Sequence, residues 1–251
     1  MNNVYGLSMG KSYPAEQLRR LRKKRRMNIL KSAILFTFAM LGEIFILNHF
    51  SGVLKIGFNI PFLAVLLLLF LALIFFALML HYFKPSKDER KFSRGVEGEK
   101  LFRKYLDKLR GYKFYSLPLP HGGDIDALLI SNKGIFAFEV KNYSGIIECE
   151  GDEWKRIKIG KGGGKYEGHV GKPSEEAKRH AFDLQNYLNT KGFAVIVYPI
   201  VVITDSKSIL RCERCSVRVI KPEELRILLN KKNELTDKEC KRIYKEISKL
   251  I

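Results

Sequence analysis

The chain has 251 residues, with 45 Lys and Arg against 26 Asp and Glu and a formal net charge of +19. Its 46% hydrophobic content and ordinary use of Gly and Pro exclude a collagen-like, low-complexity or wholly disordered chain, and four Cys in this length exclude a disulfide-rich scaffold. The mean hydropathy is close to neutral only because very apolar and very basic stretches cancel. The length fits one ordinary domain with additional segments.

Two apolar stretches near the N-terminus predict a membrane anchor. Residues 62–80 are all apolar and would rise about 28 Å as a helix, close to the roughly 30 Å hydrocarbon core, so we predict a transmembrane helix over about 60–82. Residues 29–48 are a second, weaker candidate because Glu43 in mid-span would cost about 2.5 to 3.5 kcal/mol. A cleaved signal peptide is the alternative for this segment, but no small-residue cleavage site follows it.

Positive charge predicts the topology of this hairpin, residues 29–83. A basic segment, residues 1–28, precedes it and a basic linker, residues 84–94, follows it, so Lys and Arg on both sides place both ends in the cytoplasm. The Lys and Arg run at 19–26 is expected to lie on anionic lipid headgroups rather than on nucleic acid. The sequence therefore predicts an integral, two-helix membrane protein whose remaining domain faces the cytoplasm.

From residue 95 the periodicity changes to that of an α/β domain, which we assign to residues 95–230. Its main elements are predicted in the order α-β-β-β-α-β at 95–110, 113–119, 124–130, 134–140, 174–189 and 193–204. Further strands are expected at 146–151, as a continuation of the same sheet, and at 154–159 and 216–220, with a short helix from Pro222. The last segment, 231–251, is predicted to be an amphipathic helix in which Thr236 and Glu239 form a capping box.

Charged residues at the ends of two predicted strands are the pattern most informative about function. Asp124 and Asp126 begin one strand, while Glu139 and Lys141 end the next, on the face opposite its aromatic residues. A hairpin brings Asp126 near Glu139, and two converging carboxylates suit a hard cation such as Mg²⁺ or Mn²⁺. A lysine beside the metal can orient or deprotonate water, as phosphodiester hydrolysis requires, and Glu99 is expected to reach the same site. On spacing alone, solvated strand ends or ion pairs explain these residues equally well.

Three stretches carry a resemblance to a known family: EGEKLFRKYL at 97–106, HGGDIDALLI at 121–130 and GIFAFEVKNYSG at 134–145. Together with Trp154 they resemble the nuclease-related domain (NERD) family, a branch of the PD-(D/E)xK phosphodiesterase superfamily, over roughly residues 95–205. The resemblance implies a restriction-endonuclease-type core, a mixed sheet flanked by helices, in agreement with the order of elements derived from periodicity.

By that resemblance Asp126 and Glu139 would be metal ligands and Lys141 the catalytic lysine. Asp124 would be a neighbouring acid and Glu99 the acid carried by the first helix. One departure concerns the second helix, where the family usually has Asn-Pro followed by Gln. This chain has Lys172 and Pro173 followed by Glu176. Either Glu176 adds an acid to the site or the helix has a different register, which puts the contribution of the second helix in doubt.

Other chemistry-bearing residues have two interpretations each. The Gly- and Lys-rich loop at 159–172 lacks the spacing of a nucleotide-binding loop. The basic residues of this loop and of the helix that follows it either contact a nucleic-acid backbone or are solvated. They are Lys161, Lys165, Lys172 and Arg179. His121 could join the acidic site, but a surface turn is the favoured interpretation. Cys212 and Cys215 have the spacing of half a zinc site or a redox pair; incidental cysteines are favoured, and a cytoplasmic compartment argues against a stable disulfide.

The sequence as a whole therefore predicts a membrane-anchored nuclease that depends on Mg²⁺ or Mn²⁺. Its expected partners are nucleic acid, DNA more than RNA, and a lipid membrane, with backbone affinity supplied by the basic charge. The alternative is a non-catalytic, membrane-tethered nucleic-acid-binding or scaffold protein that keeps the nuclease fold. Retention of Asp126, Glu139 and Lys141 argues against this alternative, whereas Glu176 argues mildly for it. The sequence does not specify an oligomeric state.

Overall fold

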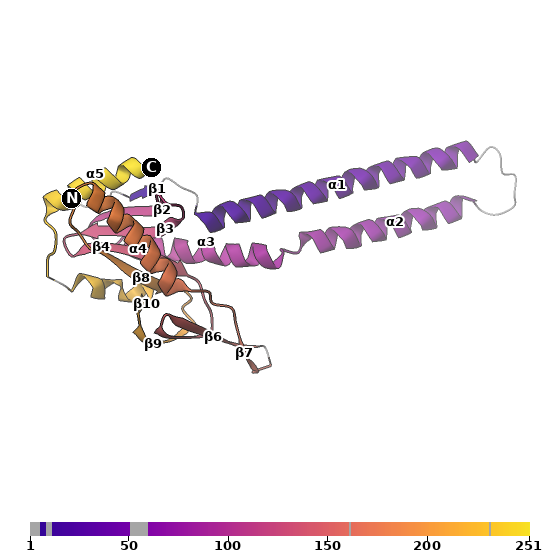
Figure 1. The fold of residues 1–251 in the computed structure, drawn as a ribbon. Coiled ribbons are helices and arrows are strands. Elements are labelled where there is room, and N and C mark those ends of the chain that lie inside the picture. Colours follow the sequence, from indigo (N-terminus) through magenta and orange to yellow (C-terminus); the bar gives the residue numbers. More distant parts are fainter. Residues whose placement is uncertain (1–5, 9–11, 51–59, 161, 231) are drawn as a thin grey trace. The chain divides into compact units, whose positions relative to one another are not determined.

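The computed structural model describes residues 6–8, 12–50, 60–160, 162–230 and 232–251 (Figure 1). It divides into two compact units. One comprises Gln17–Lys91, and the other comprises Phe92–Ile251 together with the described residues up to Glu16. The larger unit therefore includes an N-terminal piece of chain that the sequence assigned to a separate basic segment.

The smaller unit consists of helical segments. It contains most of α1 (Tyr13–Phe50), all of α2 (Ile60–Phe83) and the first residues of α3 (Lys87–Leu106). Phe36 and Phe75 stack with their ring centroids 4.1 Å apart. Arg25 donates to the carbonyl oxygen of Phe83 at 3.2 Å and forms a 3.2 Å ion pair with Glu89.

The predicted transmembrane hairpin is contradicted within the part of the chain that the structure describes. No helix there is long and apolar enough to cross a membrane. The segment 29–48 is not a separate helix but the continuation of the basic first half of α1. Part of the second predicted span, about 60–82, falls on residues whose side chains lie outside the described part of the chain. The prediction of an integral, multi-pass membrane protein is therefore wrong for the described part of the chain.

The larger unit is built on a six-stranded mixed sheet with the strand order β1-β2-β3-β4-β8-β10. The strands are β1 (Gly6–Ser8), β2 (Tyr112–Pro118), β3 (Asp124–Ser131), β4 (Gly134–Lys141), β8 (Val197–Ile203) and β10 (Arg218–Ile220). β2, β3 and β4 are antiparallel neighbours, and β8 lies parallel to β4. A parallel return of this kind needs a crossover connection, which here includes α4 (Pro173–Thr190).

Helices cover both faces of this sheet, so that β4 is buried on both sides. Ile135 and Ala137 face a core that also contains residues of α4 and of α5 (Asp237–Ile247). Phe136 and Phe138 face a core formed with α3 and with the 3₁₀ helix η1 (Pro222–Leu229). Figure 1 shows α4 crossing in front of the strands. The predicted alternation of β4, and the α-β-β-β-α-β order with helices on both faces, are confirmed.

A second sheet departs from the sequence-based expectation. Residues 146–151 do not continue the main sheet but form part of a separate four-stranded sheet with the order β7-β6-β5-β9. Its strands are β5 (Ile146–Gly151), β6 (Glu153–Ile159), β7 (Lys165–Glu167) and β9 (Ile209–Cys215). β5 pairs in parallel with β9, a strand that the sequence did not indicate. The strand predicted from residue 193 begins only at Val197.

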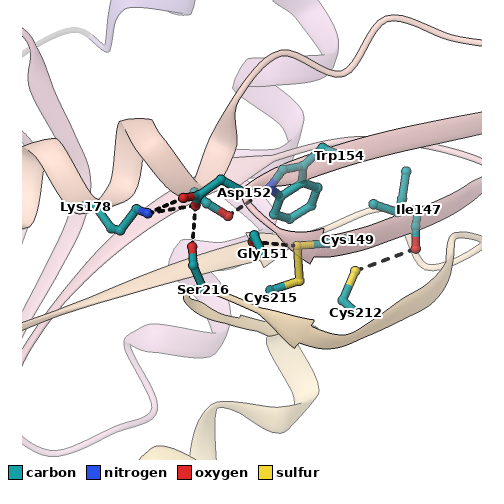
Figure 2. The surroundings of a disulfide bond; sticks show 10 residues. Ile147, Cys149, Gly151, Asp152, Trp154, Lys178, Cys212, Cys215 and Ser216 are labelled. Carbon is teal, nitrogen blue, oxygen red and sulfur yellow. Dashed lines mark hydrogen bonds and ion pairs between the residues drawn. A yellow bond between two sulfur atoms is a disulfide. The ribbon is translucent and has the colours of Figure 1, made fainter.

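The cysteines are paired differently from the expectation. Cys149 on β5 and Cys215 on β9 form a disulfide, with their Cα atoms 5.4 Å apart (Figure 2). The prediction that disfavoured a stable disulfide is therefore wrong for this pair, and the CxxC spacing does not reflect a bond between its own two members. Cys212 carries a free thiol, whose sulfur lies 3.6 Å from the carbonyl oxygen of Ile147. At the C-terminus, the predicted capping box of α5 is confirmed, because Thr236 and Glu239 bond to each other's backbone N–H groups.

Candidate active site

The predicted acidic residues meet where β3 and β4 separate. The ladder between these strands runs from the Ser131–Gly134 pair to the Ala127–Phe138 pair and stops there. One residue beyond, the carboxylate of Asp126 accepts a 2.7 Å hydrogen bond from the backbone N–H of Val140. A side chain thus replaces the backbone partner that a continued ladder would have supplied. The two strands separate at this point, and the hydrogen bond brings Asp126 close to the residues that end β4.

Glu139 and Lys141 lie on one face of β4, as predicted, and bond to each other. The ammonium nitrogen of Lys141 is 2.7 Å from Oε1 of Glu139 and 2.7 Å from Oε2 of Glu176. Glu139 is almost completely buried, whereas Lys141 and Glu176 are partly exposed. Of the two alternatives that the sequence left open for the second helix, Glu176 therefore follows the first: it reaches the site, as a direct partner of Lys141.

The structure adds His180, which the sequence analysis did not select. Nδ1 of this buried side chain lies 3.2 Å from Oε2 of Glu139, close enough for an ion pair although without good hydrogen-bond alignment. His180 follows Glu176 by four residues, so both lie on one face of α4. Gly123, with a φ of +84°, closes over the ring: a Cβ there would lie 3.2 Å from Nε2 of His180. This contact, together with the positive φ, explains a glycine in the HGGDID stretch.

Glu99 enters the site from α3, and a close helix approach makes this possible. At Gly98 a Cβ atom would lie 2.7 Å from Oγ1 of Thr204 and 2.9 Å from Cβ of Asn142, so a larger residue would push the helix away. Glu99 is hydrogen-bonded to Ser12, which immediately precedes α1. Glu99, Ser12 and Asp126 all line a cavity of about 170 Å³. The cavity is large enough for several water molecules.

The carboxylates of the site repel each other in a poorly solvated space. Burial, opposed by Ser12 and reinforced by the charges of Asp124 and Glu139, raises the pKa of Glu99 to about 7. Burial and the charges of Glu139 and Glu99 likewise raise the pKa of Asp126 well above its usual value. Burial and Glu139 also raise the pKa of Asp124, which accepts a hydrogen bond from the backbone of Tyr13.

Glu139 and Lys141 stabilise each other's charge. Burial alone would raise the pKa of Glu139, but His180 and Lys141 outweigh it and hold that pKa below the usual value. Burial alone would lower the pKa of Lys141, but Glu139 and Glu176 help to raise it far above the usual value. At neutral pH the site therefore contains one permanently charged lysine, one ionised carboxylate and further carboxyls that retain protons unusually well.

The other side of α4 is held by the four-stranded sheet (Figure 2). Nε1 of Trp154 donates a 2.8 Å hydrogen bond to Oγ of Ser174. The ammonium of Lys178 bonds both carboxylate oxygens of Asp152, at 2.6 and 2.7 Å, and Asp152 also accepts a hydrogen bond from Ser216. Positions 174 and 178 of α4 thus contact the second sheet, whereas positions 176 and 180 contact the end of β4.

The donor atoms fit a divalent cation, but their arrangement does not complete a site. Mg²⁺ and Mn²⁺ prefer oxygen ligands, and Asp126, Glu139 and Glu99 supply carboxylates whose mutual repulsion a cation would relieve. Among the described residues, however, no three His, Cys, Asp or Glu side chains form a group that could hold a metal ion. The carboxylate of Glu139 is taken up by Lys141 and His180. Binding an ion would require Glu139 to exchange one of these contacts.

The remaining predicted residues lie outside this cluster. His121 is exposed in a turn and has no hydrogen bond or ion pair within the described part of the chain. Lys165 is exposed on β7, and Lys172 forms a 2.8 Å ion pair with Glu175. Arg179 is exposed and lies 3.2 Å from Nε2 of His180. Lys161 falls outside the described residues.

Comparison with known proteins gives one match. Residues 94–204 match the family described as nuclease-related domain (NERD). No curated protein and no solved structure shows a significant match to the chain. The matched range begins in α3 and ends one residue after β8, so it contains Glu99, Asp126, Glu139, Lys141 and Glu176. Residues 94–204 are therefore similar to the nuclease-related domain family, and they lie on a mixed α/β fold, as the sequence predicted.

Proposed function

We propose that the nuclease-related domain hydrolyses phosphodiester bonds of nucleic acid with the help of Mg²⁺ or Mn²⁺. The observation that carries the proposal is the convergence of Asp126, Glu139, Lys141 and Glu99 at the open end of β3 and β4. Strongly perturbed titratable groups of this kind cluster at functional sites more often than elsewhere. In this proposal Asp126 and Glu139 hold the cation.

Lys141 acts as a cation in this mechanism and not as a base. Its pKa is raised by its carboxylate partners, so it keeps its proton throughout the neutral range. A protonated lysine can donate hydrogen bonds to the attacking water or to a phosphate oxygen, and it counters the negative charge that develops there. Glu176 holds the same ammonium group at 2.7 Å and thereby fixes its position.

Glu99 is the best-placed group to accept a proton. A general base works most efficiently when its pKa lies near the working pH, and the pKa of Glu99 is about 7. Glu99 lines the same cavity as Asp126, and that cavity has room for the attacking water. A bound cation would supply Lewis acidity and lower the pKa of the water. The residues of this chain would orient that water and remove its proton.

The substrate that this proposal assigns is nucleic acid, with DNA favoured over RNA. The chain has a net charge of +19, which favours a polyanionic partner. Affinity that comes from phosphate contacts does not depend on base sequence and falls steeply as salt is added.

Cleavage assays test the proposal. The full chain is incubated with labelled single- and double-stranded DNA and RNA in Mg²⁺, Mn²⁺ or EDTA, beside Asp126→Asn and Lys141→Met. Removal of the lysine is expected to lower the rate by about 10²- to 10⁴-fold. Glu213→Gln, on exposed β9, is the matched control and should cleave normally. Metal-independent cleavage, or equal cleavage by all four proteins, would refute the assignment.

A non-catalytic nucleic-acid-binding role is the second candidate. It is favoured by the lack of a ready metal-binding group in the described residues and by the ion pair between Glu176 and Lys141. This alternative predicts oligonucleotide binding that is the same in EDTA and in Mg²⁺, with no cleavage under any condition. Glu176→Gln distinguishes an enzyme that this ion pair inhibits from a binding protein. Removing the Glu176 carboxylate frees Lys141 from one partner, which would restore cleavage in an inhibited enzyme but not in a binding protein.

A further inference from the structure

Three cationic side chains gather beside the candidate active site, and the proposed mechanism does not use them. They are Arg94 on α3 and Arg156 and Lys158 on β6. Arg156 and Lys158 occupy alternate positions of one strand, so their side chains leave it on the same face. Burial and then the charges of Arg156 and Arg94 lower the pKa of Lys158. The charges of both arginines therefore act on Lys158, and the segment at 142–144 bonds to Arg94 and to Arg156.

The cluster has few negative partners. Arg94 and Lys158 form no ion pair within the described part of the chain, and Arg156 bonds only to neutral groups. The Arg156 guanidinium donates to the carbonyl oxygen and hydroxyl of Ser144, at 2.9 and 3.0 Å, and to the carbonyl oxygen of His169 at 3.5 Å. Asp205 is near enough to affect Arg156, but its carboxylate accepts a 2.8 Å hydrogen bond from the backbone of its own loop.

Several other basic residues of the same unit are neutralised within the chain. Lys172, Lys178, Arg211 and Arg214 each form an ion pair with a carboxylate, at distances from 2.6 to 3.5 Å. Like charges that are held together without neutralisation destabilise the fold, so their placement indicates an anion that is supplied from outside the chain.

The segment that follows Lys141 holds the cluster in place. The side-chain amide of Asn142 donates a 2.8 Å hydrogen bond to the carbonyl oxygen of Arg94, and Ser144 accepts from Arg156. Three residues of extended chain span at most about 10 Å. Along the helix axis of a duplex each strand carries one phosphate per roughly 3.4 Å, so a span of this length covers about three of them. A strand bound at the cluster can therefore reach the site at Lys141.

We infer that Arg94, Arg156 and Lys158 bind a backbone phosphate of the strand that the active site cuts. The inference rests on the proposed function and names the part of the substrate that is held. Arg156 is 7% exposed, and three hydrogen bonds fix the orientation of its guanidinium. The stem of the partly exposed Lys158 lies against Gly168, where a Cβ would come within 2.8 Å. Preorganised cations of this kind suit a phosphate with several oxygen acceptors.

The test compares two double variants that remove the same charge. Arg94→Gln with Lys158→Gln removes two cations of the cluster, and Lys241→Gln with Lys245→Gln removes two exposed lysines of α5. Arg156 is left intact because it also holds Ser144 and His169. Binding of a labelled single-stranded DNA oligonucleotide to the full chain is measured by fluorescence anisotropy in EDTA, over a range of chloride concentrations.

The cluster variant, Arg94→Gln with Lys158→Gln, is expected to bind the oligonucleotide about tenfold more weakly than the α5 variant. The slope of log affinity against log chloride concentration should become shallower by about 1.4, or 0.7 for each lost phosphate contact on a single strand. Equal affinities and slopes for the two variants would overturn the inference. Titration with inorganic phosphate alone at constant ionic strength separates the two sources of phosphate: phosphate binding that is lost in the cluster variant, together with equal oligonucleotide affinities for the two double variants, would assign the cluster to free phosphate and overturn the inference.

This experiment separates the inference from the proposed function. Because binding is measured in EDTA, a chain that never cleaves nucleic acid can still show the expected loss, in which case the phosphate site stands and the nuclease proposal fails. If the native chain cleaves nucleic acid but the two double variants bind the oligonucleotide equally well, the nuclease proposal stands and the phosphate site is refuted.

Discussion

The two sheets of the larger unit contain the same types of charged residue in opposite circumstances. On the six-stranded sheet, Glu139 and Lys141 end a strand that is buried on both faces, and their pKa values are displaced in opposite directions. On the four-stranded sheet, Glu148 pairs with Arg211 on an exposed strand, with an N–O distance of 3.0 Å. An exposed pair contributes little, typically up to about 1 kcal/mol. Burial, and not the presence of charge, therefore distinguishes the candidate active site from the surface of the second sheet.

Helix α4 connects the two regions. Ser174 and Lys178 attach it to Trp154 and Asp152 of the second sheet, while alternate positions hold the charged residues at the end of β4. The second sheet therefore serves the site indirectly, by fixing the helix that positions Lys141.

The largest effect is expected at Trp154, which is 8% exposed and belongs to the core under the second sheet. Trp154→Ala should lower the free energy of unfolding by about 3 to 5 kcal/mol, as judged by urea denaturation, because it leaves a cavity and removes the hydrogen bond to Ser174. Trp154→Phe keeps most of the packing and should cost only about 1 to 2 kcal/mol. Equal losses for the two variants would show that packing does not hold α4 here.

The disulfide should contribute next. Cys149 and Cys215 are 66 residues apart in sequence, so their bond restricts the unfolded chain and should stabilise the fold by about 2 to 4 kcal/mol. Adding a thiol reductant should lower the urea midpoint of the native chain but not that of Cys149→Ser. Cys212→Ser, which removes a free thiol, should respond to reductant as the native chain does. An unchanged midpoint on reduction would contradict this role.

The charge of Glu99 should make stability depend on pH. The pKa of Glu99 is about 7 in the folded chain against an ordinary value of 4.5, so the folded state binds more protons between these values. Stability should therefore fall as pH rises from about 4.5 through 7. At pH 8, Glu99→Gln should be more stable than the native chain by about 2 to 3 kcal/mol. The free energy of unfolding of Glu99→Gln should still fall as pH rises, but less steeply, because the pKa of Asp126 is also raised.

Comparison of denaturation midpoints at pH 5 and pH 8 measures this difference. Glu97→Gln, two residues earlier on the exposed surface of α3, is the matched control and should follow the native curve. A Glu99→Gln curve that is parallel to the native one would contradict the account of the buried carboxyl.

The smallest effect is expected at His180, which contacts Glu139 without reaching the substrate in our account. His180→Gln should lower kcat by about 10- to 100-fold with little change in KM, because residues that orient a ligand typically act on this scale. The urea midpoint should change little. Asp183→Asn, a partly exposed residue later on α4, serves as the control. A large loss of stability with normal kcat in the folded fraction would assign His180 a purely structural role.

The sequence was most informative where the fold depends on local patterns. Strands β2, β3 and β4 and helix α4 follow from alternation and from helical periodicity, and the acids at the strand ends follow from charges that interrupt apolar runs. The second sheet could not be derived in this way, because β5 pairs with β9 across about 60 residues of chain and nothing local specifies that pairing. The Cys149–Cys215 bond was missed for the same reason.

Two site residues escaped prediction for different reasons. His180 is a single histidine on an amphipathic helix, a pattern common in ordinary cores, and only its spacing from Glu176 pointed to the site. Ser12 was assigned to a separate basic segment, although it bonds to Glu99 in the folded chain. Glu176 was identified because it departs from the residue that the family usually has, but the sequence did not reveal its bond to Lys141.

The central claim is that the carboxylates at the end of the six-stranded sheet, and not those of the four-stranded sheet, hold a divalent cation. Titration of the full chain with Mn²⁺, followed by loss of the free-ion electron paramagnetic resonance signal, tests it most directly. Asp126→Asn with Glu139→Gln should lose binding, whereas Glu148→Gln with Glu150→Gln, which removes the same charge from β5, should retain it. Unchanged Mn²⁺ binding by the first variant, or equal losses in both, would contradict the claim.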